Sequence, residues 1–581
     1  MRPPRHASYS PIPLVVMVAL AISGNVAAQN PPQGLHASSL QSASARVDTL
    51  FEQWNSSESP GCSLGVSRDG ALAYERGYGM ANLELGVPIT PASVFHVASV
   101  SKQFTAMSLL LLAERGLLSL DDDVRKFVPE LPDYGDRLTL RHLLTHTSGL
   151  RNWFTLQALA EPHDNGWTEE FFVETLARQR QLNFTPGSEY QYLNSGYMLL
   201  GIIVRRVSGQ SLGVFADSNI FKPLGMANSH FHDSPSVLVP NRASGHRRGS
   251  SGFQVELDDW AWAGRGEPVL VGNTGLFTTS RDLLLWEQNL AEVRVGNPTL
   301  VAAMQEPTIL GSGEVSLYGF GLQIGTHRGL RTIAHGGSDP GYSAYVVRYP
   351  AQGLAIAVLC NLEGISTARL ARSVADVYLE HLFTAPGSSS TPAGPTVVPL
   401  SPQEQARYVG LFYDHLNHIF RSVFIRDGRL MVSPRPDNSL GVELTAVGPN
   451  RFLRPGGIVV EYVPGSAEQD PQYREGMEEE SSRRVFARVT ASAPSNTELV
   501  EFAGQYASSE LDTLYTLAAR NAELVLQVKG RAPVALRPVF PDAFYGLIGL
   551  VRFSRDTQQQ ITGFTLNTSD VRGLGFDRVT R

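Results

Sequence analysis

The chain has 581 residues and a formal net charge of −7 at pH 7; 42% of its residues are hydrophobic and 18% are charged. This length exceeds a single hydrophobic core, and the composition is typical of folded domains rather than of a disordered protein. The negative net charge argues against a nucleic-acid partner. The two cysteines form no CxxC pair and no HExxH segment occurs, so we predict neither a metal site nor a cofactor.

The N-terminus has the order of a secretory signal peptide. A short basic start precedes an apolar run over residues 12–22, and the small residues of segment 26–28 (VAA) follow. This order predicts a signal peptide over residues 1–28, cleaved after Ala28, and therefore an exported protein that is periplasmic or secreted. The apolar run is about half of the roughly 20 residues that a membrane span needs, and no later segment is long and apolar enough to span a bilayer.

The next elements predict a helix, a hairpin and a second helix. Residues 39–55 carry apolar side chains at helical spacing, which indicates an amphipathic helix. Segment 61–79 (GCSLGVSRDGALAYERGYG) alternates apolar and small or polar residues and contains an Arg-Asp-Gly turn signal, so we expect two paired strands. Residues 100–115 form a largely apolar helix that ends at Gly116.

Three strand-like runs occur later in the chain, namely RTIAHGG, SAYVVRYP and GLAIAVLCN. Residues 120–384, which include these runs, mix helical patterns with Gly- and Pro-rich loops. An amphipathic helix over residues 367–383 closes the region. Helices at both ends with antiparallel strands between them indicate an α+β layer.

The C-terminal third changes character. Residues 385–399 form a Pro-, Gly- and Ser-rich linker, and the chain beyond it consists of short strand patterns separated by turns. The segment YVGLF at 408–412 resembles FAGQY at 502–506, an offset of about 90 residues that is typical of a repeat. We therefore predict two β-repeat domains, small barrels or sandwiches, over residues 400–490 and 498–581. Within the first, we expect the acidic segment 466–482 to be a loop.

Three short motifs carry residues suited to catalysis. They are Ser99-Val100-Ser101-Lys102, Tyr192-Leu193-Asn194 and His335-Gly336-Gly337. Residues three apart share one face of a helix, so the amine of Lys102 can hydrogen-bond the hydroxyl of Ser99. A serine hydroxyl is a weak nucleophile until an adjacent base takes its proton, and a lysine whose pKa is lowered by burial can be that base.

The other two motifs supply proton transfer and a close backbone approach. Tyr192 can deliver a proton to a leaving group, and Asn194 can orient Lys102 and a substrate amide. The two glycines after His335 lack Cβ atoms, which lets a strand edge approach a substrate backbone. Taken singly, each motif is also compatible with an ordinary helix turn, an aromatic and amide pair in a loop, or a tight turn.

Together and in this order, the motifs resemble those of the serine β-lactamase and penicillin-binding protein superfamily, and within it the class C-like branch. The flanking stretches VFHVASVSKQFTA, LRHLLTHTSGL, PGSEYQYLNSGYMLLG, YGFGLQI and HGGSDPGYSAYV fit the same resemblance. It covers residues 41–384 and implies an α+β fold with an antiparallel sheet flanked by helices plus a helical subdomain. A catalytic domain followed by β-repeats, lipocalin-like or small barrels, is similar in architecture to D-aminopeptidases.

The resemblance implies a role for each matching residue. Ser99 would be the acylated nucleophile, and Lys102 and Tyr192 would share general acid–base work. Asn194, His335, Gly337 and Ser338 would contact substrate. The backbone N–H groups of Ser99 and Ser338 would form the oxyanion hole.

Two further pairs of residues need an interpretation, one of histidines and one of cysteines. His142 and His146 have the i, i+4 spacing of a metal pair but lack the glutamate of a zinc peptidase, so we interpret both as structural. In the fold of this superfamily the first and last strands of the sheet are antiparallel neighbours. That arrangement implies that Cys62 and Cys360 lie opposite each other, either as a disulfide or as two close thiols.

The third motif departs from the pattern of most β-lactamases, because histidine replaces lysine at position 335. Histidine is mostly neutral near pH 7 and is a weaker partner for a β-lactam carboxylate. We therefore expect a peptidase or amidase that acts on small molecules or on D-residue peptides, peptidoglycan fragments included. A broad-specificity esterase or a class C-like β-lactamase is the alternative, and a non-catalytic binding protein on the same scaffold is the third possibility. The oligomeric state and the role of the β-repeats stay open.

Overall fold

The computed structural model describes residues 37–162, 168–234, 236–256, 269–383, 397–436, 438–454, 458–466, 470–477, 484–520 and 523–579. The predicted signal peptide and most of the predicted linker lie outside the described residues.

Six antiparallel strands form the central sheet of the N-terminal region, in the order β12-β13-β14-β15-β1-β2. The bounds are β1 (Cys62–Arg68), β2 (Ala71–Tyr78), β12 (Gln323–His327), β13 (Leu330–Asp339), β14 (Tyr342–Tyr349) and β15 (Leu354–Cys360). The predicted hairpin is β1–β2, and Asp69 and Gly70 turn it with φ of 51° and 78°. Every residue of β14 and β15 is buried, including Ser343 and Arg348 of β14, and β15 is apolar throughout.

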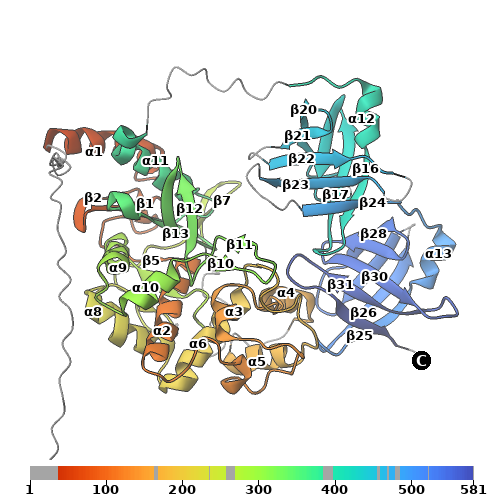
Figure 1. Cartoon of the computed structure of the whole chain (residues 1–581), viewed down its shortest axis with the longest axis horizontal. Coiled ribbons are helices and arrows are strands. Elements are labelled where there is room, and N and C mark those ends of the chain that lie inside the picture. Colours follow the sequence, from red (N-terminus) through yellow and green to blue (C-terminus); the bar gives the residue numbers. More distant parts are fainter. Residues whose placement is uncertain are drawn as a thin grey trace, which may run out of the picture.

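The two faces of the sheet are covered by different helices. On one face α1 (Ala37–Phe51) and α11 (Thr367–Leu379) lie side by side, and Ile356 and Val358 of β15 pack against them (Figure 1). On the other face lies α9 (Ser280–Glu292) with the helical part of the region. A Cβ atom at Gly65 would lie 3.0 Å from a Leu284 methyl group, so this glycine lets α9 approach β1 closely.

The helical part contains α2 (Lys102–Glu114), α3 (Leu140–Leu144), α4 (Trp153–Leu159), α5 (Glu169–Ala177), α6 (Asn194–Ser208), α7 (Leu212–Ala216), α8 (Lys222–Leu224) and α10 (Pro298–Met304). Short strands form four small separate sheets, in the orders β3-β4, β5-β9-β6, β7-β8 and β10-β11. Their bounds are β3 (Met80–Asn82), β4 (Val87–Pro88), β5 (Phe95–His96), β6 (His230–Phe231), β7 (His246–Gly249), β8 (Gly252–Val255), β9 (Leu276–Thr278), β10 (Thr308–Ile309) and β11 (Val315–Ser316). No single helix of the described chain is long and apolar enough to cross a membrane; α6 taken together with 212–224 reaches that length and composition but bends by 75°.

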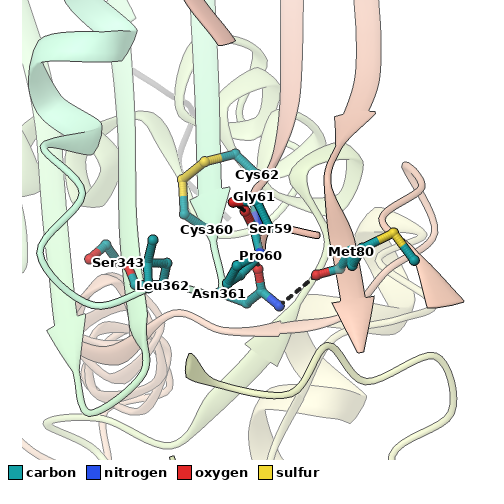
Figure 2. Close-up of a disulfide and its surroundings, with 9 residues drawn as sticks. All are labelled: Ser59, Pro60, Gly61, Cys62, Met80, Ser343, Cys360, Asn361 and Leu362. Atoms are coloured by element: carbon teal, nitrogen blue, oxygen red, sulfur yellow. Dashed lines mark hydrogen bonds between the residues drawn. A yellow bond between two sulfur atoms is a disulfide. The ribbon is translucent and has the colours of Figure 1, made fainter. Parts of the chain in front are cut away.

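A disulfide joins the first and last strands of the sheet. Cys62 and Cys360 are direct register partners of β1 and β15, with Cα atoms 4.0 Å apart (Figure 2). Of the two arrangements that the sequence left open, the structure has the bonded one. The neighbouring Asn361 side chain accepts from the Gly61 N–H and donates to the Met80 carbonyl, which fastens the same end of the sheet to the next segment.

Two all-β units come after this region. The first is a nine-stranded antiparallel sheet in the order β19-β18-β17-β16-β24-β23-β22-β21-β20. Its strands are β16 (Gly410–Asp414), β17 (Ile419–Arg426), β18 (Arg429–Ser433), β19 (Val442–Glu443), β20 (Thr445–Gly448), β21 (Arg451–Arg454), β22 (Ile458–Val463), β23 (Gln472–Met477) and β24 (Arg484–Val489). The two end strands β19 and β20 follow each other in the chain, so the sheet curls toward closure without a ladder between its ends.

The second unit, the terminal barrel, is a closed barrel of eight strands. They are β25 (Gly504–Ser508), β26 (Thr513–Arg520), β27 (Glu523–Val528), β28 (Val534–Phe540), β29 (Ala543–Gly546), β30 (Gly549–Arg555), β31 (Ile561–Asn567) and β32 (Leu574–Arg578). Figure 1 shows this barrel beside α4 and α5 of the N-terminal region. An α+β region followed by an all-β region confirms the fold class predicted from the sequence.

Both units begin in the same way. Helices α12 (Pro402–Tyr408) and α13 (Asn496–Glu501) each start with a capping box between a serine and a glutamate, and a strand that opens with glycine follows each helix. The last strand of each unit then donates an arginine hydrogen bond back to this start: Arg488 to the Val409 carbonyl at 2.7 Å, and Arg578 to the Ala503 carbonyl at 2.8 Å. The sequence similarity therefore reflects a repeated structural element.

The structure corrects one prediction in the first unit. Segment 466–482 contains strand β23, although its acidic composition predicts a loop. Tyr473 of this strand is buried between aromatic neighbours, and Glu475 is buried against Arg421 and Arg454. The carboxylate is paired inside the sheet, so its charge does not indicate solvent exposure at this position.

Candidate active site

Ser99 lies in a tight turn at the start of α2. The turn is a short 3₁₀ helix (Ala98–Ser101), and Ala98 has a positive φ of 47°, which is strained for a residue with a Cβ atom. The Ser101 hydroxyl stabilises the turn by donating to the Ala98 carbonyl at 2.5 Å and accepting from the Leu276 N–H at 3.1 Å. Ser99 itself stays partly exposed, so its hydroxyl is accessible at the N-terminal end of a helix.

Lys102 is fully buried beside it. Its Nζ atom lies 2.9 Å from Ser99 Oγ, 2.9 Å from Asn194 Oδ1 and 2.8 Å from the Asn273 carbonyl oxygen. A neutral amine has two N–H donors and one lone pair. The two carbonyl-type oxygens of Asn194 and Asn273 take both donors, which leaves the lone pair for the Ser99 hydroxyl.

Burial lowers the pKa of Lys102 well below its usual value, and the charge of Asp339 only partly opposes this shift. The folded protein therefore favours the neutral amine more than water does. This is the protonation state in which Lys102 can take a proton from Ser99.

Tyr192 and Asn194 approach the pair from the start of α6. The Tyr192 ring lies 4.8 Å from Lys102 Nζ, and about a third of the side chain (36%) is exposed. Burial raises the pKa of Tyr192, and its hydrogen bond with Ser99 opposes this rise. The phenol is protonated at neutral pH and can act as a proton donor.

The edge of β13 completes the site. A Cβ atom at Gly337 would lie 2.1 Å from the Val97 carbonyl oxygen, so only glycine lets the strand lie against the turn that carries Ser99. Among the described residues, β12 pairs with β13 only as far as Ala334, which leaves the edge beyond it open. Asp339 and Tyr342 close a two-residue hairpin, so Ser338, one residue before Asp339, directs its backbone N–H away from β14 toward the open edge.

His335 was predicted to contact substrate, but in this structure its ring is buried. Its side chain is only 1% exposed, because Tyr318 covers it and donates its hydroxyl to Nε2 at 3.0 Å. Nδ1 faces the Gly336 carbonyl at 2.6 Å and must therefore carry the hydrogen. Burial, aided by the charge of Lys102, lowers the pKa of His335 to about 3. The ring is neutral and supplies no positive charge for a substrate carboxylate.

The two histidines interpreted as structural have different surroundings. His142 belongs to the capping box of α3 with Thr139. His146 lies at the centre of the site: it has a positive φ of 57°, its Nδ1 accepts from the Leu193 N–H at 3.0 Å, and its ring centroid is 4.3 Å from that of Tyr192. It positions the backbone between Tyr192 and Asn194. The i, i+4 spacing of His142 and His146 did not predict the contacts of His146 with Leu193 and Tyr192.

Three further residues reach the site from outside the three short motifs. Asn273 contributes a carbonyl to Lys102, Tyr318 covers His335, and the carboxylate of Asp339 accepts from the Thr274 hydroxyl at 3.1 Å. Asp339 lies two residues after the third motif, within the stretch HGGSDPGYSAYV, and this position is its sequence signal. No group of three or more His, Cys, Asp or Glu side chains within the described ranges is arranged to hold a metal ion.

The fold and this geometry agree with the comparison with known families. A family model described as Beta-lactamase matches residues 47–379, more than half of the chain. The chain belongs to the Beta-lactamase family. Its resemblance to this superfamily, which the motifs carry, is thereby confirmed.

Two curated proteins are similar to this chain over part or most of its length. It is 28% identical over 307 residues to the D-aminopeptidase of Gluconobacter oxydans, a match that covers 52% of this chain and 56% of that protein. It is 27% identical over 460 residues to penicillin-binding protein 4* of Bacillus subtilis, covering 76% of this chain and 99% of that protein. The family and these relatives make the chain a serine hydrolase.

Solved structures support the fold over a longer stretch. The octameric penicillin-binding protein homologue from Pyrococcus abyssi is similar with a TM-score of 0.50 and 21% identity, covering 85% of this chain and 99% of that one. A structure of SurE with D-Leu is similar with a TM-score of 0.51 and 23% identity, covering 78% of this chain and all of that one. At this identity the likeness describes the fold alone.

Proposed function

We propose that this protein is an exported hydrolase that cleaves amide bonds of D-residue peptides, cell-wall fragments among them, through an acyl-enzyme on Ser99. The observation that carries the proposal is the set of three hydrogen-bond partners around Lys102 Nζ. It directs the lone pair of a neutral amine at a partly exposed serine hydroxyl.

This arrangement supports a reaction through an acyl-enzyme. Ser99 gives its proton to Lys102 as Oγ bonds to the substrate carbonyl carbon, and the carbonyl electron pair moves to oxygen. The backbone N–H groups of Ser99 and Ser338 bind that oxyanion. As the C–N bond breaks, Tyr192 gives its proton to the leaving amine and takes one from Lys102. Water then attacks the acyl-Ser99 ester by the same proton route and releases the acid.

Two observations support an amide with a D-residue as the substrate. One relative, 28% identical over 307 residues, is named a D-aminopeptidase. In addition, the buried and neutral His335 offers no charge to the carboxylate of a β-lactam, which disfavours the alternative of a class C-like β-lactamase. Esters remain chemically accessible, because the same Ser99 attack applies to them.

Two observations support export. The first 28 residues have the order of a signal peptide, and Cys62 and Cys360 form a disulfide. Structural disulfides persist in oxidising compartments and are rare in the cytosol. N-terminal sequencing of the protein isolated from cells tests this part of the proposal. Gln29 as the first residue would support export, and Met1 as the first residue would contradict it.

The test compares D- and L-alanine p-nitroanilide, p-nitrophenyl acetate and a chromogenic cephalosporin as substrates of protein that begins at Gln29. Wild-type turnover of the D-anilide should exceed that of the L-anilide. Ser99→Ala should lower turnover by at least about 1,000-fold, because the nucleophile is lost. Turnover of only the ester or only the cephalosporin would replace the proposed substrate with that class. Equal turnover by Ser99→Ala would reject the acyl-enzyme itself.

A further inference from the structure

One loop of the terminal barrel docks next to the segment that leads into Tyr192. This barrel loop, residues 568–573, connects β31 with β32. The carboxylate of Asp570 accepts from the Asn152 amide at 2.6 Å and from the Thr155 hydroxyl at 2.9 Å. The barrel loop is thus bound to α4 of the N-terminal region by its own side chain.

Arg572 is the central residue of the barrel loop. It is 7% exposed, and its guanidinium binds both carboxylate oxygens of Glu189, at 3.3 and 3.1 Å. Its backbone N–H donates to Asn183 Oδ1 at 2.8 Å, and its side chain lies over the Phe184 ring. A two-pronged arginine–carboxylate contact fixes direction as well as distance.

The residues that Arg572 contacts belong to the segment that carries Tyr192. In that segment, Gln191 accepts from the Asn183 amide at 2.9 Å and donates to the Ser569 carbonyl of the barrel loop at 2.5 Å. The Gln191 N–H also donates to the His146 carbonyl at 2.9 Å. Segment 183–191 is therefore held between the barrel loop on one side and His146 on the other, directly before Tyr192.

The barrel loop is itself fixed by a buried arginine of the N-terminal region. Arg151 is 1% exposed, donates to the Arg572 carbonyl at 2.8 and 3.2 Å, and forms an ion pair of 2.6 Å with Glu510 of the barrel. Asn417 of the nine-stranded sheet also accepts from Arg572, at 2.8 Å. All three parts of the chain thus meet at Arg572.

We propose that Arg572 is a positioning residue for the reaction, which acts through Glu189 and segment 183–191 to hold Tyr192 where it protonates the leaving group. The terminal barrel is then part of the active site's support rather than a passive appendage. This inference rests on the proposed function, in which Tyr192 is the proton donor to the leaving group.

The test uses the different proton demand of two leaving groups. An anilide needs a proton on its leaving nitrogen, whereas p-nitrophenolate leaves without one. Arg572→Ala should lower kcat on the D-anilide by about 10- to 100-fold, with a much smaller change of KM, because a displacement of about 1 Å costs about that factor. Acylation by p-nitrophenyl acetate, followed as the initial burst of p-nitrophenolate before deacylation, should slow far less, and Arg572→Lys should recover part of the loss.

Arg555→Ala is the matched control. Arg555 lies in the same barrel and pairs with Asp542 at 2.9 Å and Glu501 at 3.1 Å, all within the terminal unit. It should leave the ratio of anilide to ester turnover unchanged. If Arg572→Ala does not fold, Glu189→Gln tests the same contact from the other side and should change the ratio in the same direction.

The two proposals fail in different ways. If wild-type protein hydrolyses esters only, the proposed amidase activity fails, and phenyl acetate against p-nitrophenyl acetate then decides the role of Arg572, because phenolate needs the proton more. A folded Arg572→Ala protein with the wild-type ratio would overturn the positioning role. So would an equal fall on both substrates, since that outcome indicates a structural effect alone.

Discussion

In the nine-stranded sheet the buried carboxylate of Glu475 pairs with Arg421 and Arg454 of the same unit. In the terminal barrel the buried carboxylate of Glu510 pairs with Arg151, which belongs to the N-terminal region. Both units begin with a capped helix followed by a strand. The nine-stranded sheet pairs its buried Glu475 within the unit, whereas the terminal barrel pairs its buried Glu510 with an arginine of the N-terminal region. A buried charge is stable only with its partner, so the terminal barrel depends on the N-terminal region in a way that the nine-stranded sheet does not.

The largest expected effect comes from removing the interfacial carboxylate. Glu510→Ala leaves Arg151 buried without its ion pair, which should destabilise the docked barrel by about 3–5 kcal/mol. Calorimetry or urea unfolding of the whole chain measures this loss of stability. Anilide turnover should fall with it, because the barrel loop near Tyr192 loses an anchor.

Glu475→Ala is the control for this prediction. It removes an equally buried carboxylate from the nine-stranded sheet, where Arg421 and Arg454 are left unpaired. The transition of that unit should shift while kcat stays close to the wild-type value. Equal losses of kcat in both variants would erase the proposed difference between the two units.

An intermediate loss of stability is expected when the pH is lowered. The terminal barrel, residues 498–581, contains no histidine, so protonation of histidine should not destabilise the barrel itself. The folded pKa of His335 is about 3 against an unfolded value of 6.5, so between these values only the unfolded chain binds the proton. Stability of the N-terminal region should therefore fall as pH drops from 6.5, by about 2 kcal/mol at pH 5 from this ring alone.

The measurement is urea unfolding at pH 7, 6 and 5, with His335→Gln as the comparison. Glutamine can still bond the Tyr318 hydroxyl and the Gly336 carbonyl, but it does not titrate. The variant should show a flatter dependence on pH. An identical slope in both proteins would mean that His335 is already charged in the folded state.

The smallest effect is expected at an exposed pair of the nine-stranded sheet. Arg429 and Glu443 lie 3.1 Å apart with side chains 68% and 46% exposed. Such pairs contribute about 0–1 kcal/mol, so Arg429→Ala should change the unfolding free energy by less than about 0.5 kcal/mol. A loss above about 2 kcal/mol would show that this edge of the sheet is covered by another surface in solution.

The parts of the site that the sequence predicted are those set by local geometry or by family motifs. The spacing of three residues between Ser99 and Lys102 places both side chains on one face of a helical turn. Asn273 reaches Lys102, and Arg572 reaches the segment before Tyr192, through tertiary packing, and no short pattern around either residue signals it. In the fold, periodicity predicted the helices over 39–55, 100–115 and 367–383 and the hairpin of segment 61–79. It did not predict strand β23, because the buried Glu475 is neutralised by arginines distant in sequence.

The disulfide has a topological consequence for the whole site. Cys62 and Cys360 are 298 residues apart, and Ser99, Tyr192 and His335 all lie between them. Every residue of the motifs thus belongs to one covalent ring, and a protease cut in any of its loops leaves a single molecule until the bond is reduced. Arg572 lies outside the ring. The loop that supports Tyr192 is therefore attached by contacts that can open and close again, while the residues of the motifs stay linked.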